Sequence, residues 1–179
     1  MALEIATLGG GCFWCIEHSF SLLKGVNSVY SGYAGGLSEN PTYEDICTGL
    51  SGHAEVIQIT FDNEIIDYHA LLAVFFSLHD PTTLNRQGND SGTQYRSVIF
   101  YHDEIQKNIA QKMIIQVDNS DVWEDKVVTE LAQLPKFYQA ENHHQAYFTN
   151  NAQTPYCQMV VAPKVEKFVN QFKDNLKQI

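Results

Sequence analysis

Residues 3–33 read LEIATLGGGCFWCIEHSFSLLKGVNSVYSGY. The apolar run at residues 3–8 stops at three consecutive glycines, which is typical of a strand that enters a tight turn. From Cys12 onward, apolar side chains recur at helical spacing as far as Gly25, and glycine often follows the last turn of a helix. Residues 26–33 are a second strand candidate. This stretch therefore predicts a strand, a helix and a second strand in succession.

The remaining sequence predicts further strands and helices. Residues 53–61 alternate in polarity, as in a strand with one buried side, and Asp67 can cap a helix that follows. Asp103 can likewise open a helix that runs to about Val117. The other predicted elements are a strand at 96–101, a strand at 126–131, a helix at 140–148, and a helix at 163–176 with Pro163 at its start.

The order strand, helix, strand, strand, helix, strand is that of the split βαβ, or ferredoxin-like, plait. We therefore expect an α+β fold with a mixed sheet covered by helices on one face, and a single domain over residues 1–179. Residues 31–52 and 79–94 are interrupted by glycine and proline and predict long irregular loops. Long irregular segments in a compact domain often carry function, so both stretches are candidate site loops.

The charge balance of the chain excludes several classes of partner. The 11 Lys and Arg against 21 Asp and Glu leave a net charge of −10. A surface this acidic repels phosphate backbones and anionic lipids, which argues against nucleic-acid and membrane partners. No apolar stretch approaches the ~18 residues of a membrane helix, and residues 1–8 lack the regions of a signal peptide. We therefore expect a cytoplasmic protein, and we expect it to be a monomer.

Cys12 is the strongest candidate for a reactive side chain. It is predicted to open a helix, where unpaired backbone N–H groups and the helix dipole stabilise a thiolate. A lowered thiol pKa makes cysteine nucleophilic at neutral pH, although a buried, unreactive cysteine is the alternative. Cys15 lies on the same helix face and can close a disulfide with Cys12. No second pair of ligands has metal-binding spacing, so no metal site is predicted.

Glu55 is the second candidate. Strand alternation places it on the side shared by Ile57, Ile59 and Phe61, which is the expected core side. Apolar surroundings disfavour the ionised carboxyl group and raise its pKa, so that it can act as a general acid near neutral pH. The alternative is a glutamate at the rim of the sheet with no chemical role.

Several motifs in this chain resemble the A-type methionine sulfoxide reductases, in the same order and from about residue 4 to residue 165. They are Gly11-Cys12-Phe13-Trp14, Pro41-Thr42-Tyr43-Glu44, Gly52-His53-Ala54-Glu55-Val56, His79-Asp80-Pro81-Thr82-Thr83, Gln87-Gly88-Asn89-Asp90, Gly92-Thr93-Gln94-Tyr95-Arg96-Ser97, Ala140-Glu141 and His144-Gln145. The resemblance implies reduction of the S epimer of methionine sulfoxide, in oxidised proteins and peptides, without a metal or organic cofactor. It also implies that Cys12 is the nucleophile and that Glu55 protonates the sulfoxide oxygen.

The resemblance assigns further residues to the substrate. Tyr43 and Tyr95 are expected to hydrogen-bond the sulfoxide oxygen, and Asp90 to hold the polar network of the site. Phe13 and Trp14 are expected to form the apolar pocket for the substrate methyl group. The alternative for each tyrosine is an ordinary half-buried aromatic, and for Asp90 a turn residue.

A second thiol is needed to convert the resulting sulfenic acid into a disulfide, which thioredoxin, or dithiothreitol in vitro, then reduces. Related enzymes often have glycine where this chain has Cys15, and many carry resolving cysteines in a glycine-rich tail. Cys157 lies near that position but precedes an apolar run that predicts fixed structure. We therefore expect Cys15 to be the resolving thiol, with Cys157 as the alternative, and Cys47 to be buried and inert.

Two rival functions remain. A general thiol–disulfide oxidoreductase would use Cys12 and Cys15 but leave Glu55 and the tyrosines without a role. A small acidic interaction domain would explain none of the site loops.

Overall fold

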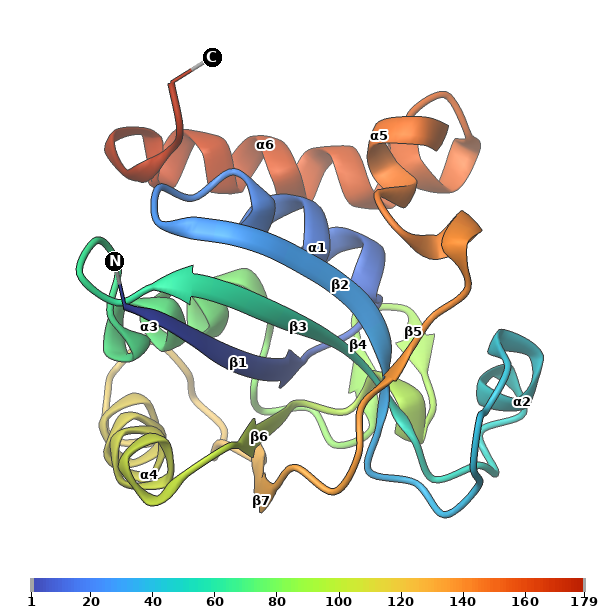
Figure 1. The fold of residues 1–179 in the computed structure, drawn as a ribbon, viewed down its shortest axis with the longest axis horizontal. Coiled ribbons are helices and arrows are strands. Elements are labelled where there is room, and N and C mark those ends of the chain that lie inside the picture. Colours follow the sequence, from blue (N-terminus) through green and yellow to red (C-terminus); the bar gives the residue numbers. More distant parts are fainter. Residues whose placement is uncertain (1, 179) are drawn as a thin grey trace.

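Strand β1 (Leu3–Gly9) lies inside a six-stranded sheet, whose order is β7-β6-β1-β3-β2-β8 (Figure 1). The computed structural model describes residues 2–178. The other strands of this sheet are β2 (Val26–Ala34), β3 (Ala54–Asp62), β6 (Val98–Tyr101), β7 (Glu130–Gln133) and β8 (Tyr138–Gln139). Strand β3 lies between β1 and β2 and is antiparallel to both, whereas β7 is parallel to β6. The predicted α+β fold with a mixed sheet is confirmed.

Helices cover one face of this sheet. They are α1 (Phe13–Ser21), α3 (Tyr68–Leu78) and α4 (Glu104–Asp118), with α6 (Ala162–Gln171) packed over α1 (Figure 1). The main hydrophobic core lies between these helices and the sheet. On the opposite face, Val56, Val98 and Phe100 are covered by the chain around Leu134 and Phe137. Within residues 2–178, no helix is long and apolar enough to cross a membrane.

The predicted helix starts at Asp67 and Asp103 are confirmed. Each carboxylate accepts a hydrogen bond from the third following backbone N–H group, at 2.7 Å from Ala70 and 2.8 Å from Gln106. Helix α1, by contrast, ends at Ser21, before the glycine expected to close it. The predicted strand at 126–131 begins later, at Glu130 in β7.

The last third of the chain differs most from expectation. The predicted helix at 140–148 is a 3₁₀ turn (Asn142–His144) followed by a short helix α5 (Tyr147–Asn151). Between them Ala146 adopts a left-handed backbone conformation (φ 49°), which ends the first turn. The predicted helix at 163–176 ends at Gln171, and a wide π turn (Cys157–Val161) leads directly into it. Because Pro163 has no N–H group for a regular α-helical bond, it favours such a wider turn before it.

Both stretches that were predicted to be irregular contain short regular elements. Residues 31–52 include the end of β2 and a five-residue helix α2 (Tyr43–Cys47), which Thr42 and Asp45 cap reciprocally. Residues 79–94 include the small hairpin of β4 (Arg86–Gln87) and β5 (Asp90–Ser91) and the start of a 3₁₀ turn (Thr93–Tyr95). Figure 1 shows α2, this hairpin and α5 on the side of the molecule where β1 ends. The candidate site therefore lies at that end of the sheet.

Candidate active site

The glycine turn between β1 and α1 places Cys12 at the start of the helix. Gly11 has φ 80°, a left-handed conformation that favours glycine, and its N–H group donates to the carbonyl of Tyr95 at 3.1 Å. Cys12 is the N-cap of α1 and is buried, with 6% of its surface exposed. The predicted position at a helix start is confirmed.

Glu55 lies on β3 and faces this helix start. It is 2% exposed, and its Oε1 accepts the N–H of Phe13 at 3.3 Å. Burial is the main cause that raises the pKa of Glu55 well above its usual value, and a negative charge at Cys12 adds to it. The prediction that Glu55 lies on the core side of its strand is confirmed. The carboxyl group is therefore suited to hold a proton next to Cys12.

The pKa of Cys12 differs from the sequence prediction. The hydrogen bond with Cys15, followed by burial, raises the pKa of Cys12, and these effects outweigh the lowering by the N–H of Trp14. The same hydrogen bond is the main cause that lowers the pKa of Cys15. The two opposite pKa shifts arise from one proton that the pair shares. A thiol that donates to a thiolate stabilises it, so the first ionisation of the pair is favoured and the second is disfavoured. The prediction of a lowered pKa at Cys12 itself is wrong in this structure.

Tyr43 and Tyr95 approach Glu55 from α2 and from the 3₁₀ turn after β5. Burial raises the pKa of both hydroxyl groups, and the charge of Glu55 is the next cause for each. Both tyrosines therefore keep their protons and can act as hydrogen-bond donors.

Asp90 is tied to a residue that sequence reasoning missed. The hydroxyl of Tyr156 donates to Oδ2 of Asp90 at 3.0 Å. Burial raises the pKa of Tyr156, and charges at Cys12 and Cys15 raise it further. Tyr156 thus closes the site from the C-terminal segment. Its position directly before Cys157 was the only signal in the sequence.

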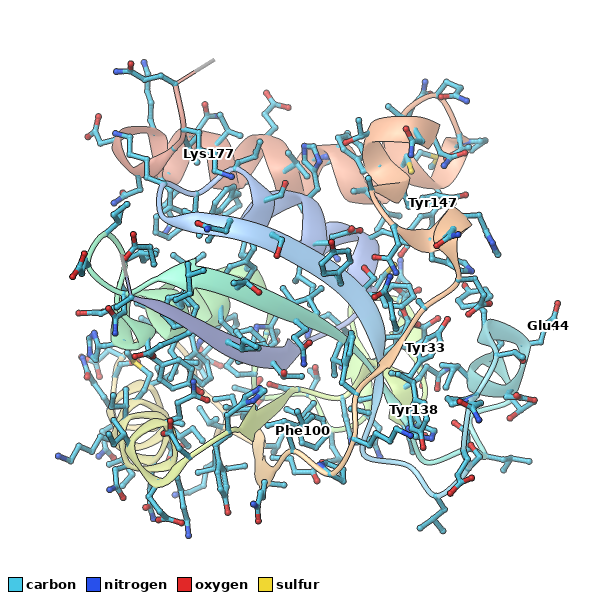
Figure 2. All side chains as sticks on the ribbon, in the orientation of Figure 1. Tyr33, Glu44, Phe100, Tyr138, Tyr147 and Lys177 are labelled. Atoms are coloured by element: carbon cyan, nitrogen blue, oxygen red, sulfur yellow. The ribbon has the colours of Figure 1, made fainter. Side chains whose placement is uncertain are left out.

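An aromatic cluster surrounds Trp14. Its indole stacks on Tyr147 with ring centroids 3.7 Å apart, and its Nε1 donates to Nδ1 of His144 at 3.3 Å. The ring of His144 also lies 4.2 Å from that of Tyr43. Figure 2 shows Tyr147 on the same side of the molecule as Tyr33 of β2. The structure thus brings Phe13, Trp14 and Tyr43 together, with His144 and Tyr147 as additional members that were not predicted as site residues.

Three of the cysteines lie in one buried cluster. Cys12, Cys15 and Cys157 pack together with Val161 and Val165, and their exposed fractions are 6%, 7% and 0%. Cys157 belongs to the π turn, so the prediction that it lies in fixed structure agrees with the fold. It nevertheless lies close to the other two thiols.

Cys47 was expected to be buried, and this prediction is wrong. It is exposed because it ends the short surface helix α2, whose only buried side chain is that of Ile46.

One group of side chains has the composition and spacing of a metal site, but hydrogen bonds already engage two of its three members. Within residues 2–178, ligand atoms of Glu141, His143 and His144 lie within 4.8 Å of one another. The Glu141 carboxylate already accepts hydrogen bonds from the Tyr33 hydroxyl and the Tyr43 N–H. Nδ1 of His144 accepts a hydrogen bond from an indole, so a neutral ring carries its proton on Nε2 and has no free lone pair for a metal.

A buried thiol at a helix start, a second thiol that shares its proton, and a carboxyl group with a raised pKa beside them are the groups that a cysteine-dependent enzyme with an internal acid requires. The hydroxyl groups of two tyrosines and an aromatic wall complete the site.

Comparison with known proteins identifies the family to which this cysteine-dependent site belongs. The sequence profile of the peptide methionine sulfoxide reductase family matches residues 4–176. Peptide methionine sulfoxide reductase MsrA of Saccharolobus solfataricus is 55% identical over 175 residues, which cover 98% of each chain. The chain therefore belongs to the peptide methionine sulfoxide reductase family.

Two solved structures show similar folds. Methionine sulfoxide reductase A of Corynebacterium diphtheriae superposes with a TM-score of 0.76 at 32% identity, covering 85% of this chain and 76% of that chain. Mxr1 from Saccharomyces cerevisiae, in complex with Trx2, has a TM-score of 0.50 at 25% identity, covering 81% of this chain and 84% of that chain.

Proposed function

We propose that this chain reduces methionine sulfoxide in oxidised proteins and peptides, with Cys12 as the nucleophile and Glu55 as the acid. The observation that carries the proposal is the buried Glu55 carboxyl group, which is hydrogen-bonded to the backbone adjoining Cys12 and has a raised pKa. The Cys12 sulfur attacks the sulfoxide sulfur while Glu55 protonates the oxygen. The hydroxyl group then passes from the substrate sulfur to the Cys12 sulfur as the bond between the two sulfurs breaks, which releases methionine and leaves a sulfenic acid on Cys12. Sulfur is reduced in the substrate and oxidised in the enzyme by two electrons.

The shared proton of the thiol pair explains how Cys12 can attack despite its raised pKa. Cys12 donates a hydrogen bond to Cys15, and the pKa of Cys15 is lowered. When Cys15 is ionised, transfer of the Cys12 proton to the Cys15 sulfur along this bond produces the attacking thiolate without release of a proton to water.

The surroundings of the thiol favour one epimer of the substrate. Hydroxyl donors from Tyr43 and Tyr95 hold the sulfoxide oxygen near Glu55, and Asp90 supports this network through Tyr156. Phe13 and Trp14 supply the apolar side for the methyl group. When oxygen and methyl are both fixed, only one handedness of the pyramidal sulfur presents itself to Cys12. We assign this preference to the S epimer, as the family resemblance implies.

A single comparison of activities separates this function from its rival. Wild-type protein is expected to reduce a methionine sulfoxide peptide with dithiothreitol and to show little insulin disulfide reduction. The rival oxidoreductase predicts the reverse, because Cys12 and Cys15 alone would suffice for disulfide exchange.

The predictions of a monomer and of a cytoplasmic location remain predictions.

The sulfenic acid is then resolved by Cys15, with release of water and formation of a disulfide. The N–H of Cys15 donates to the carbonyl of Cys12 at 3.2 Å, so both residues occupy the first turn of α1. A disulfide needs Cα atoms about 5.5–6 Å apart, which residues of one helical turn can meet with little movement. Thioredoxin would reduce this disulfide, and the solved complex of Mxr1 with Trx2 supports that partner.

Replacing Cys15 by serine is expected to allow one methionine to be released per enzyme but to prevent sustained turnover with thioredoxin. The matched variant Cys157→Ser is expected to turn over at the wild-type rate. Disulfide mapping by mass spectrometry after one equivalent of substrate should locate a Cys12–Cys15 bond. A bond between Cys12 and Cys157 in the wild-type protein would instead make Cys157 the resolving thiol.

A further inference from the structure

The glycine turn before Cys12 rests on two buried polar side chains that the proposed reaction does not use. A Cβ atom on Gly10 would lie 2.9 Å from the ring of His79, and one on Gly11 would lie 2.7 Å from Cγ of Gln87. His79 is 6% exposed and Gln87 is 9% exposed. The absence of side chains in the turn therefore lets its backbone lie directly on these two groups.

Gln87 is held by both ends of its amide group. Its Oε1 accepts the N–H of Asp80 at 2.8 Å, and its Nε2 donates to the carbonyl of Asp80 at 2.9 Å. These paired bonds leave the amide little freedom to rotate. The methylene groups of Gln87 are consequently fixed under Gly11.

The ring of His79 is also fixed, by hydrogen bonds at both of its nitrogen atoms. Its Nδ1 lies 2.7 Å from the carbonyl of Phe75, which can only accept, so Nδ1 carries the proton. Its Nε2 therefore accepts from the hydroxyl of Ser97 at 2.7 Å. Burial lowers the pKa of His79 to about 4, which keeps the ring in this neutral form near pH 7. The ring thus joins the end of α3 to the segment that carries Tyr95.

The same turn also contacts the predicted acid and one tyrosine through the backbone. A Cβ atom on Gly9 would lie 2.7 Å from the carbonyl of Glu55, and the N–H of Gly11 bonds to the carbonyl of Tyr95. Each glycine of the turn therefore meets a different segment of the site. The location of Cys12 relative to Glu55 and Tyr95 therefore depends on the position of this turn.

We propose that Gln87 and His79 are positioning residues. They hold the glycine turn in place, and the turn fixes the position of the Cys12 sulfur relative to Glu55 and Tyr95. This inference rests on the proposed function of Cys12. Neither side chain touches the substrate. Their contribution is to the rate of the chemical step, because a displacement of about 1 Å in a reacting group can cost ~10²-fold in rate.

The test uses Gln87→Ala, which removes both the methylene packing and the amide bonds, and Gln87→Met, which keeps a side chain of similar length without those bonds. Gln111→Ala, at an exposed position of α4, is the matched control. Methionine release is measured in a single turnover over a range of sulfoxide peptide concentrations, and urea unfolding reports the folded fraction. We expect Gln87→Ala to lower the rate at saturating substrate at least about tenfold, with Gln87→Met intermediate and half-saturation little changed.

If the role of Gln87 is purely structural, Gln87→Ala will lower the urea midpoint, but the rate at saturating substrate per folded molecule will equal that of Gln111→Ala. This result would overturn the proposal. If Gln87→Ala does not fold, Gln87→Met decides: a slower saturated rate supports positioning and an unchanged one rejects it. Wild-type protein that releases no methionine would instead remove the proposed function itself. The two failures are therefore distinguishable.

Discussion

Cys12→Ser is expected to release no methionine from a sulfoxide peptide, even in a single turnover. An alcohol does not ionise near neutral pH and cannot form the sulfenic acid in which the oxygen is left. Serine is close to cysteine in size, and position 12 makes no side-chain cap to α1 that the change could disrupt. The loss should therefore be chemical, with the urea unfolding curve close to that of the wild type.

The measurement is methionine released per enzyme, by chromatography, with Cys47→Ser as the control. Cys47 is exposed at the end of α2, and serine keeps a polar partner for the Tyr43 hydroxyl, so this variant tests whether the loss of a cysteine other than Cys12 stops the reaction. Cys47→Ser should retain wild-type release. Retention of about a tenth of wild-type activity by Cys12→Ser would refute the assignment of the nucleophile.

Glu55→Gln is expected to slow methionine release by ~10²–10⁴-fold, which is the usual contribution of general acid catalysis. The amide has nearly the same shape and can still accept the N–H of Phe13, but it has no acidic proton to deliver to the sulfoxide oxygen. Single-turnover release at neutral pH measures the effect. A rate equal to that of the wild type would rule out the acid role.

The pH dependence and the stability of this variant provide two further checks. The protonated form of Glu55 is the active one, so the wild-type rate should fall as pH rises through the raised pKa, and the variant should lose this fall. Because the pKa of Glu55 is higher in the folded state than in the unfolded chain, the unfolded chain releases this proton at lower pH. The free energy of unfolding of the wild type therefore decreases as pH rises above the pKa of an ordinary glutamate. Glu55→Gln should therefore be at least as resistant to urea as the wild type at neutral pH, which separates lost chemistry from lost folding.

The parts of the structure that were predictable depend on short-range patterns. The glycine turn ends β1 because glycine tolerates the left-handed conformation at Gly11, and the alternation along β3 places Glu55 inside. Asp67 and Asp103 start helices through their own side chains. Such signals lie within a few residues of the feature they determine, and the sequence therefore contains them.

The parts that were not predictable depend on contacts between distant segments. Tyr147 and Tyr156 enter the site because the chain after Ala146 folds over α1, and the left-handed conformation of that alanine has no glycine to signal it. The raised pKa of Cys12 was missed for a similar reason. The N–H groups at the start of α1 are local and lower the pKa of Cys12, whereas the hydrogen bond with Cys15 and the burial, which raise it, depend on the folded site.

The most direct test of the central claim follows the sulfoxide oxygen itself. The double variant Cys15→Ser/Cys157→Ser, which lacks both candidate resolving thiols, is mixed with a peptide whose sulfoxide carries isotopically labelled oxygen, in the absence of any reductant. We expect one methionine released per enzyme and one labelled oxygen on the tryptic peptide that contains Cys12. Methionine release without labelled oxygen on Cys12, or no release at all from the folded variant, would contradict this claim.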